Sequence, residues 1–455
     1  MTFANILHLR ILGKKFCFGG KGMKNRHLTK ALALALALVL CVGIFAGCKT
    51  KDPVTPTPDG SQATPTPAET EGTPVDSEKT HIVLGAARPL SGVYQVFEDS
   101  VFGPIYKMWV DEINAAGGIY VEEYGKKLLI DVKVYDDTSD MATMVRMTEK
   151  LILEDKVDIM LPSCSTAFVF AQAEITNQYG KLLISAEGGS AELSAESAKY
   201  PMFFNSANHS VTQVPELVKV LTEMGVTSVY IMYVEDSHGL EYSGTIKPLL
   251  EAAGIELKAA KAVPPDIADL SPIITDAQAS GADAFLSFCY PDQNFPAFFT
   301  SMAMGYNPKA MMFGPGGNMD VFPWAIAGEN AEGIMAFGGF NAKSSPGAKD
   351  FVDKYNALYP ELGIDWWGHL PYYASLEVLA QAIEGAGTLD NAKIAEYIKN
   401  NTFDTSMGPV YFHNGQIAEE CYLGEVGQWQ NGIFEVIDTN DRRTADPIYP
   451  KPDWK

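Results

Sequence analysis

Residues with hydroxyl, thiol or carboxyl groups follow several apolar runs of the chain. Ser163, Cys164, Ser165 and Thr166 stand between an apolar run and an amphipathic segment. Hydroxyls and free backbone N–H groups at the start of a helix bind an anion without a full positive charge. The alternative use of the same residues is an ordinary helix cap made by a Ser or Thr side chain. The spacing alone does not separate an anion site from a cap.

A second group of candidates follows the next apolar run. Glu187 precedes Gly188 and Gly189, and two glycines allow a ligand to approach the backbone closely. The carboxylate of Glu187 has two uses that the sequence leaves open. It faces an amine of the ligand, or it pairs with Arg88, which stands in the loop after the first apolar run.

Catalysis and metal binding are not expected. Ser165, His238 and Asp236 supply the residue types of a nucleophile, a base and an acid, but the chain has neither GxSxG nor a serine–lysine motif. The absence of CxxC and HExxH argues against a metal centre, and we expect no cofactor. We also expect no obligatory disulfide among Cys164, Cys289 and Cys421.

Apolar runs and amphipathic segments alternate through the chain after residue 80. Strands alternating with helices of this length predict the α/β class with parallel sheets, and the chain is long enough for two lobes. In such sheets ligands bind beyond the carboxyl ends of the strands. The predicted strands are 81–87, 128–135, 157–162, 181–186, 228–234, 255–263 and 283–290, and the predicted helices are 101–116, 141–154, 165–179, 212–225, 240–253, 270–280 and 293–305.

The order of short motifs resembles a known family. The segments PLSG at 89–92, EINAAGGI at 112–119, DDTSD at 136–140 and YPKPDW at 449–454 are similar to motifs of the branched-chain amino-acid-binding (Leu/Ile/Val) family of extracytoplasmic solute receptors. The likeness spans almost everything from residue 81 onward. It implies a type I periplasmic-binding-protein fold, in which two Rossmann-like lobes with parallel sheets are joined by a three-strand hinge.

The resemblance also implies the lobe boundaries and a set of ligand contacts. Lobe 1 is expected at 81–204 plus 342–408 and lobe 2 at 205–341 plus 409–455. Ser165 falls on the family's carboxylate-binding serine, and Phe97 falls on an aromatic position that covers the ligand, with a core role as its alternative. Tyr290 retains a family tyrosine, whereas His238 replaces an aromatic residue.

One departure from the family concerns the ligand's ammonium group. Gly316 falls where amino-acid-binding members place the carboxylate that pairs with the α-ammonium. Either Glu187 or Asp292 supplies that carboxylate instead, or the ligand lacks the ammonium. The aromatic residues Phe97 and Tyr290, with Trp366 or Trp367, favour an aromatic or aliphatic carboxylate.

The N-terminus predicts export and a lipid anchor. Residues 1–48 read as a signal peptide, with Met23 as a possible true start, a basic run at 24–30 and an apolar run at 31–46. The ending FAGC at 45–48 resembles a lipoprotein signal box, which would make Cys48 the lipidated residue. Residues 49–80 are rich in Pro, Thr and acid and predict a disordered tether. We expect a protein anchored by lipid to the outer face of the cell membrane.

The net charge excludes one class of partner and the family suggests others. A formal charge of −22 without a basic stripe argues against nucleic-acid binding. The resemblance implies a monomeric substrate-binding lipoprotein that passes an amino acid or a similar carboxylate to an ABC permease and its ATPase. A receptor that presents its closed form to a sensor kinase or chemoreceptor is the main alternative, and an adhesin with a degenerate cleft is another.

Overall fold

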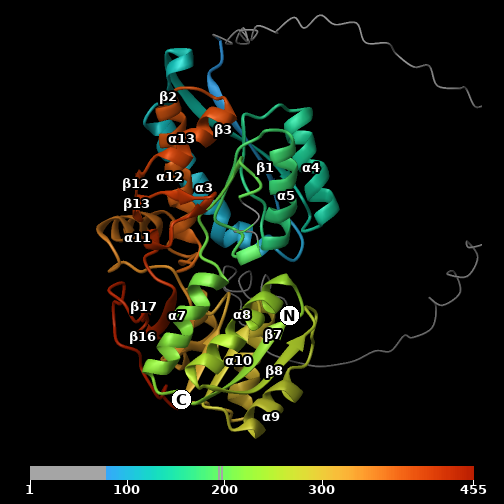
Figure 1. Cartoon of the computed structure of the whole chain (residues 1–455), viewed down its shortest axis with the longest axis vertical. Coiled ribbons are helices and arrows are strands. Elements are labelled where there is room, and N and C mark those ends of the chain that lie inside the picture. Colours follow the sequence, from blue (N-terminus) through green and yellow to red (C-terminus); the bar gives the residue numbers. More distant parts are fainter. Residues whose placement is uncertain (1–77, 193–194, 196–197) are drawn as a thin grey trace, which may run out of the picture. The chain divides into compact units, whose positions relative to one another are not determined.

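Two mixed sheets, each covered by helices, organise the chain from residue 78 onward (Figure 1). The structure is a computed structural model, and it describes residues 78–192, 195 and 198–455. These residues belong to one compact unit. The signal peptide, Cys48 and nearly all of the predicted tether lie outside the described residues.

The first sheet has eight strands, most of them parallel, in the order β14-β15-β6-β5-β4-β1-β3-β2. In Figure 1, α3 and α12 lie on one side of β1 and α4 and α5 on the other. We call this sheet with its helices the first lobe. Its strands are β1 (His81–Arg88), β2 (Ile119–Val121), β3 (Lys126–Asp136), β4 (Ile159–Met160), β5 (Leu183–Ser185), β6 (Phe203–Asn205), β14 (Phe412–His413) and β15 (Gln416–Ile417), and its helices are α2 (Gln95–Phe97), α3 (Gly103–Ala115), α4 (Met141–Leu153), α5 (Thr166–Gln178), α11 (Pro346–Leu358), α12 (His369–Ala386) and α13 (Asn391–Asn400).

The second sheet has seven strands in the order β17-β16-β11-β10-β9-β7-β8 and forms the second lobe. A small pair, β12 (Phe403–Thr405) and β13 (Gly408–Val410), stands apart from both sheets. The strands of the second sheet are β7 (Ser228–Val234), β8 (Glu256–Val263), β9 (Ala284–Phe288), β10 (Ala310–Phe313), β11 (Ile334–Phe337), β16 (Val426–Gln430) and β17 (Ile433–Val436), and its helices are α7 (Ser210–Glu223), α8 (Ser237–Ala253), α9 (Ser271–Ser280) and α10 (Pro291–Ala303).

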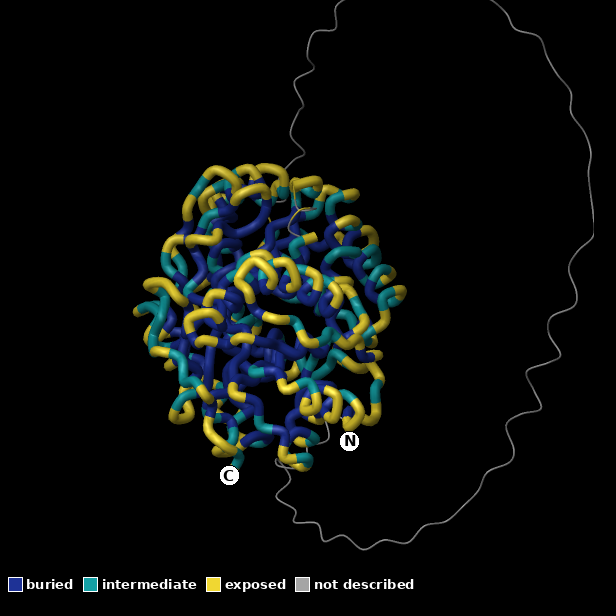
Figure 2. Tube along the Cα trace, turned by 60° about the horizontal axis from the view of Figure 1, so that its bottom comes forward, coloured by how far each residue is buried: buried dark blue, intermediate teal, exposed yellow. Residues whose placement is uncertain are grey.

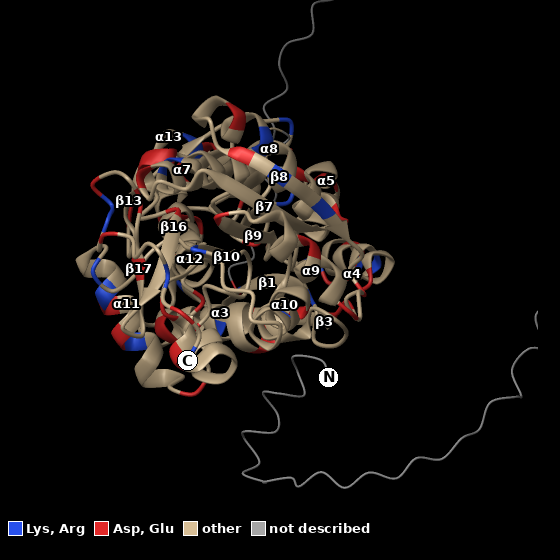
Figure 3. Ribbon diagram, turned by 90° about the horizontal axis from the view of Figure 1, so that it is seen from below, with Lys and Arg blue, Asp and Glu red and all other residues tan. Residues whose placement is uncertain are grey.

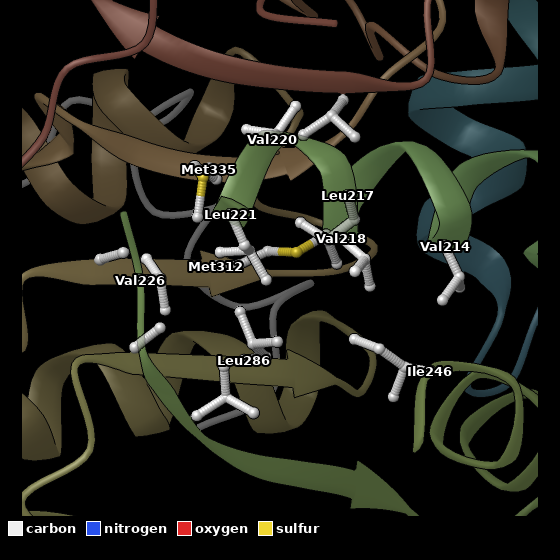
Figure 4. Close-up of a cluster of buried hydrophobic side chains, with 14 of the residues drawn as sticks. Val214, Leu217, Val218, Val220, Leu221, Val226, Ile246, Leu286, Met312 and Met335 are labelled. Carbon is white, nitrogen blue, oxygen red and sulfur yellow. The ribbon is translucent and has the colours of Figure 1, made fainter. Parts of the chain in front are cut away.

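The predicted α/β class with parallel sheets is confirmed. In each lobe the apolar runs form the strands, and the apolar faces of the amphipathic helices pack against them. The strands β1, β4, β7, β9 and β10 are almost wholly buried, as parallel strands covered on both faces must be. Figure 2 shows buried segments in the interior and exposed ones around them. In the second lobe, the apolar face of α7 packs on β9, β10 and β11 through side chains such as Leu217, Leu221 and Met312 (Figure 4). Burial of these side chains fixes the helices against the strands whose ends carry the candidate site.

One helix end shows how local sequence sets the geometry. The predicted helix at 101–116 ends where expected, because α3 ends at Ala115 and is followed by Gly117 and Gly118, which both have positive φ. A Cβ on Gly118 would lie 2.2 Å from the carbonyl oxygen of Leu128, so no larger residue fits there. The side chain of Asn114 bonds both the N–H and the carbonyl of Ile130, which ties the helix end to β3.

In the described residues the chain passes between the two sheets three times, after β6, after β11 and after β15. The amide of Asn208 in the first passage donates to the carbonyl of Gly424 and to Glu425 in the third, at 3.0 and 2.8 Å. The expected allocation of residues 409–455 to lobe 2 differs from the sheet pairing, because β15 pairs with β6 through Gln416 and Asn205. The lobe boundaries stay a prediction.

Two further observations concern the surface. Within the described residues, no helix combines the length and the apolar composition needed to cross a membrane. In the view of Figure 3, Lys and Arg are interspersed with Asp and Glu on the outer helices and loops.

Candidate functional site

A cavity of about 110 Å³ is lined by loops that follow strands of both sheets. It is comparable with a cavity of roughly 150 Å³ that holds one benzene molecule, so it suits one small solute. Nine of the residues proposed from sequence line it: Phe97, Cys164, Ser165, Thr166, Glu187, Gly189, His238, Tyr290 and Gly316. Arg88, Ser163, Gly188 and Asp292 are not among its lining residues.

Ser165 holds an unusual position at the start of α5. It is the N-cap residue, yet its side chain makes no capping hydrogen bond, and its φ of 81° is rare for a residue other than glycine. Its Oγ is buried and has no hydrogen bond of good geometry. The hydroxyl of Tyr94 lies nearby: burial raises the pKa of Tyr94, and the Ser165 hydroxyl opposes that rise. A buried hydroxyl left unused beside a helix N-terminus is what an anion site requires, whereas an ordinary cap would be bonded.

Ser163 instead makes hydrogen bonds that hold the loop in place. Its Oγ donates to Asp137 at 2.9 Å, and its backbone N–H donates to Gln172 at 2.8 Å. The hydroxyl of Ser163 is therefore already bonded, and its role in ligand binding stays a prediction. The free thiols of Cys164, Cys289 and Cys421 are all buried, and Cys164 lies in the cavity wall.

A buried ion cluster lies behind Glu187. Arg88 is fully buried and donates to Glu98 at 2.7 Å, to Glu187 at 2.6 Å and to the carbonyl of Pro162 at 2.5 Å. The predicted pairing of Glu187 with Arg88 is thus observed. Burial raises the pKa of Glu187, and the guanidinium opposes that rise. One cation already serves two carboxylates, and although its Nη2 is buried without a partner, Arg88 is not among the residues that line the cavity.

Aromatic rings form the wall on the second lobe. His238 begins α8, and its ring stacks on Tyr290 with centroids 5.2 Å apart. Burial lowers the pKa of His238 to about 4, which makes the ring neutral at pH 7, and its Nε2 is unpartnered. Asp236 accepts from the N–H of Gly239 at 3.0 Å and caps α8. No hydrogen bond joins Ser165, His238 and Asp236 in the part of the chain described, so a nucleophile–base–acid chain is not assembled.

The loop after β10 explains the departure at Gly316. This residue has a φ of 101°, and a Cβ there would lie 2.8 Å from Cγ of Pro291. A carboxylate side chain therefore has no room at this position. Asp292 is exposed on α10 and is not among the residues that line the cavity, so its proposed substitution for the missing carboxylate stays a prediction.

A carboxylate that the sequence analysis did not single out completes the wall. Asp365 lines the cavity, and its Oδ1 accepts from Asn318 at 2.6 Å, from the N–H of Trp367 at 2.8 Å and from that of Gly368 at 2.9 Å. Burial raises the pKa of Asp365, and these N–H groups counteract the rise. Of the two tryptophans considered from sequence, Trp367 lines the cavity, whereas Trp366 donates its indole N–H to Asp320.

The sequence analysis did not single out Tyr94, Phe102 or Asp365, which also line the cavity. The signal for Asp365 was the run Asp365-Trp366-Trp367-Gly368-His369, in which only the tryptophans were weighed. Tyr94 and Phe102 flank Phe97, and Phe102 ends a π-helical turn at Glu98–Phe102 that the helical periodicity did not predict. That turn brings two aromatic rings of one segment into the cavity wall.

Comparisons with known proteins agree with this architecture. A family model described as periplasmic binding protein matches residues 81–432. The Leu/Ile/Val-binding protein homolog 8 of Brucella abortus is 24% identical over 380 residues, which cover 78% of this chain and 90% of the relative.

Two solved structures are similar in fold. The branched-chain amino acid transporter substrate-binding protein LivJ from Streptococcus pneumoniae, in complex with isoleucine, superposes with a TM-score of 0.67 at 20% identity, covering 82% of this chain and 100% of that one. A solute-binding protein of an ABC transporter from Rhodopseudomonas palustris, in complex with 3,4-dihydroxy benzoic acid, gives 0.66 at 16% identity, with 82% and 98% covered.

Proposed function

The chain belongs to the periplasmic binding protein family, and on that premise we propose that it captures one small carboxylate-bearing solute, an amino acid or a similar acid, and delivers it to an ABC importer. The single observation that carries the proposal is the cavity between the strand ends of the two sheets, with the Ser165 hydroxyl at the N-terminus of α5 in its wall. Neutral donors at this point suit a carboxylate, because Arg88 is already neutralised by Glu98 and Glu187.

The residues that line the cavity come from both lobes, which supports a mechanism in which the two lobes close around the solute. Ser165 and Glu187 belong to the first lobe, and His238 and Tyr290 to the second. A solute that touches both walls favours the conformation in which they face each other, by its differential affinity for that state. We propose that the closed form is what the permease and its ATPase recognise.

The two solved relatives bear on the class of solute. One is in complex with isoleucine and the other with an aromatic acid, and both ligands carry a carboxylate. The aromatic lining of the present cavity, with Phe97, Tyr290 and Trp367, suits an apolar or aromatic remainder. We therefore propose apolar amino acids and aromatic or aliphatic acids as the substances to test.

The cellular setting is proposed from the sequence. Cys48 would carry the lipid that holds the protein to the outer face of the membrane, and residues 49–80 would separate the anchor from the lobes. Intact-mass analysis of protein made in a lipidating host should find acyl groups on a chain that begins at Cys48. Cys48→Ser should release the protein from membranes, and retention of this variant would contradict the anchor.

The test of capture is a thermal-shift screen of the full chain in detergent against amino acids and carboxylic acids. A solute at 100 times its dissociation constant adds about 2.7 kcal/mol of stability. Ser165→Ala should abolish the shift while the melting temperature without solute stays the same, because alanine adopts the same backbone at equal cost. An unchanged shift in Ser165→Ala would refute the anion site.

A further inference from the structure

Two carboxylates reach the cavity, and they are engaged differently. Oε1 of Glu187 is bonded to Arg88, whose charge it helps to neutralise, and its Oε2 is fully buried without a hydrogen-bond partner. Asp365 accepts three N–H groups, all on Oδ1, and its Oδ2 has no hydrogen-bond partner among the described residues. The residue is only 8% exposed and lines the cavity, and its Oδ2, unlike Oε2 of Glu187, is not among the fully buried atoms without a partner. One oxygen is thus held by the protein and the other is left for a ligand.

The charges around Asp365 do not include a partner for it. No Lys or Arg is among the residues that line the cavity, and neutral amide groups make all three bonds to Oδ1. Asp320, the neighbouring buried carboxylate, adds negative charge, because it accepts from the N–H of Ile364 and from the indole of Trp366 at 2.8 Å each. An enclosed carboxylate without a cation is costly, so a positively charged group that enters the cavity is stabilised there.

We infer that Oδ2 of Asp365 accepts the ammonium group of the solute, and that the solute is therefore a zwitterion of the α-amino acid type. This inference rests on the proposed function, since it places the carboxylate of the same solute at Ser165. Asp365 takes over the role for which Gly316 has no room. The rings of Phe97, Phe102 and Trp367 surround the remainder of the cavity, where they favour an apolar side chain and attract a cation through their π faces.

Asp365 also has a structural role, which the experiment has to separate from a role in ligand binding. Asp365 shapes the turn before α12 and forms an isolated antiparallel bridge with Met319 of the loop after β10. Asparagine keeps an acceptor oxygen for the same three N–H groups and replaces only the outward oxygen by an amide. Asp365→Asn should therefore fold and keep the turn, and any change in its choice between solutes reports on Oδ2.

The experiment measures dissociation constants by calorimetry for the full chain in detergent, with two matched pairs of probes. L-leucine is compared with 4-methylpentanoate, and L-phenylalanine with 3-phenylpropionate; the members of each pair differ only in the ammonium. We expect the wild-type protein to bind at least one amino acid roughly 10- to 100-fold more tightly than its partner, the range typical of a charged hydrogen bond. Asp365→Asn should remove most of that preference by weakening the binding of the amino acid, and it should not weaken the binding of the simple acid, because it removes a negative charge from the cavity.

Asp320→Asn is the matched control. It alters a neighbouring buried carboxylate with a similar bonding role outside the cavity wall, and it should preserve the preference for the amino acid even if it lowers the melting temperature. Equal binding of an amino acid and its simple acid by the wild type would overturn the inference and leave capture of a carboxylate intact. An unchanged preference in Asp365→Asn would also overturn it. Failure of all four probes to bind would instead contradict the proposed function and the inference that rests on it.

Discussion

Both walls of the cavity contain aromatic rings, but the first lobe also places a buried ion cluster behind its wall. On the first lobe, Arg88, Glu98 and Glu187 form a buried ion cluster behind the strand ends, and Asp137 and Gln172 hold the serine loop. On the second lobe, the wall consists of stacked rings and a glycine-rich loop. Buried ionic groups are expensive to disturb, whereas ring surfaces tolerate change. The comparison indicates that the first wall fixes the polar end of a solute and that the second closes over it.

Arg88→Met would test the first wall with the largest effect. The change leaves Glu98 and Glu187 buried without a cation, and we expect it to lower the free energy of unfolding by about 3–5 kcal/mol. Urea denaturation of the full chain measures this loss. Glu187→Gln is the control, because it keeps an acceptor for Arg88 and leaves one carboxylate opposite one cation, so it should cost about 1 kcal/mol or less. Equal losses in the two variants would show that the cluster is not ionic.

The pH dependence of the free energy of unfolding tests Asp320, which joins the second wall to the segment before α12. Burial raises the pKa of Asp320 to about 6, above its value of about 3.9 in an unfolded chain. The folded state therefore binds this proton more tightly, and the stabilisation from Asp320 is complete below about pH 4 and is lost as the pH rises through about 6. The contribution is on the order of 3 kcal/mol.

Asp320→Asn should remove this dependence. The difference in unfolding free energy between the wild type and the variant, measured in urea from pH 4 to pH 7.5, should change by up to about 3 kcal/mol, most steeply between pH 4 and 6. A difference that stays constant across the range would mean that Asp320 has an ordinary pKa in the folded protein.

Gly316→Ala tests the tight loop of the second wall. The left-handed φ and the close Cγ of Pro291 should make the variant about 1–3 kcal/mol less stable. Gly305→Ala, also at positive φ but with open space at its Cβ, separates the backbone cost from the clash. Thermal unfolding of both variants gives the comparison, and equal losses would remove the steric reason for glycine at 316.

His238→Phe should have the smallest effect. Phenylalanine keeps the stacking on Tyr290 and removes an unpartnered Nε2, so we expect a change in stability of about 1 kcal/mol or less and a solute affinity within about tenfold of the wild type. Because the pKa of His238 is lowered to about 4, affinity should not vary with titration of this ring between pH 6 and 8. A steep loss of binding in the variant would show that Nε2 contacts the solute.

Much of the fold could be predicted from sequence because its signals are local. A few neighbouring residues are enough to recognise the end of α3 before Gly117 and Gly118 and the largely apolar run of β7. The candidate ligand loops could be located for the same reason, because ligands bind beyond the carboxyl ends of the strands and each predicted strand shows where its loop begins.

Asp365 could not be found in this way. It precedes α12 without a strand before it and reaches the cavity through its bridge to Met319 and its bond to Asn318, two contacts between segments about 46 residues apart. The pairing of Gln416 with Asn205 is equally distant in sequence, and for that reason the sheet that receives residues 412–417 was not anticipated. Contacts of this kind are set by tertiary packing, which local patterns do not encode.

The most direct test of the whole account is a crystal structure of the protein grown with the solute that gives the largest thermal shift. The account predicts one molecule inside the cavity, in contact with Ser165 from the first lobe and with His238 or Tyr290 from the second. A solute bound outside the cavity, or contacts with only one lobe, would contradict capture between the two lobes.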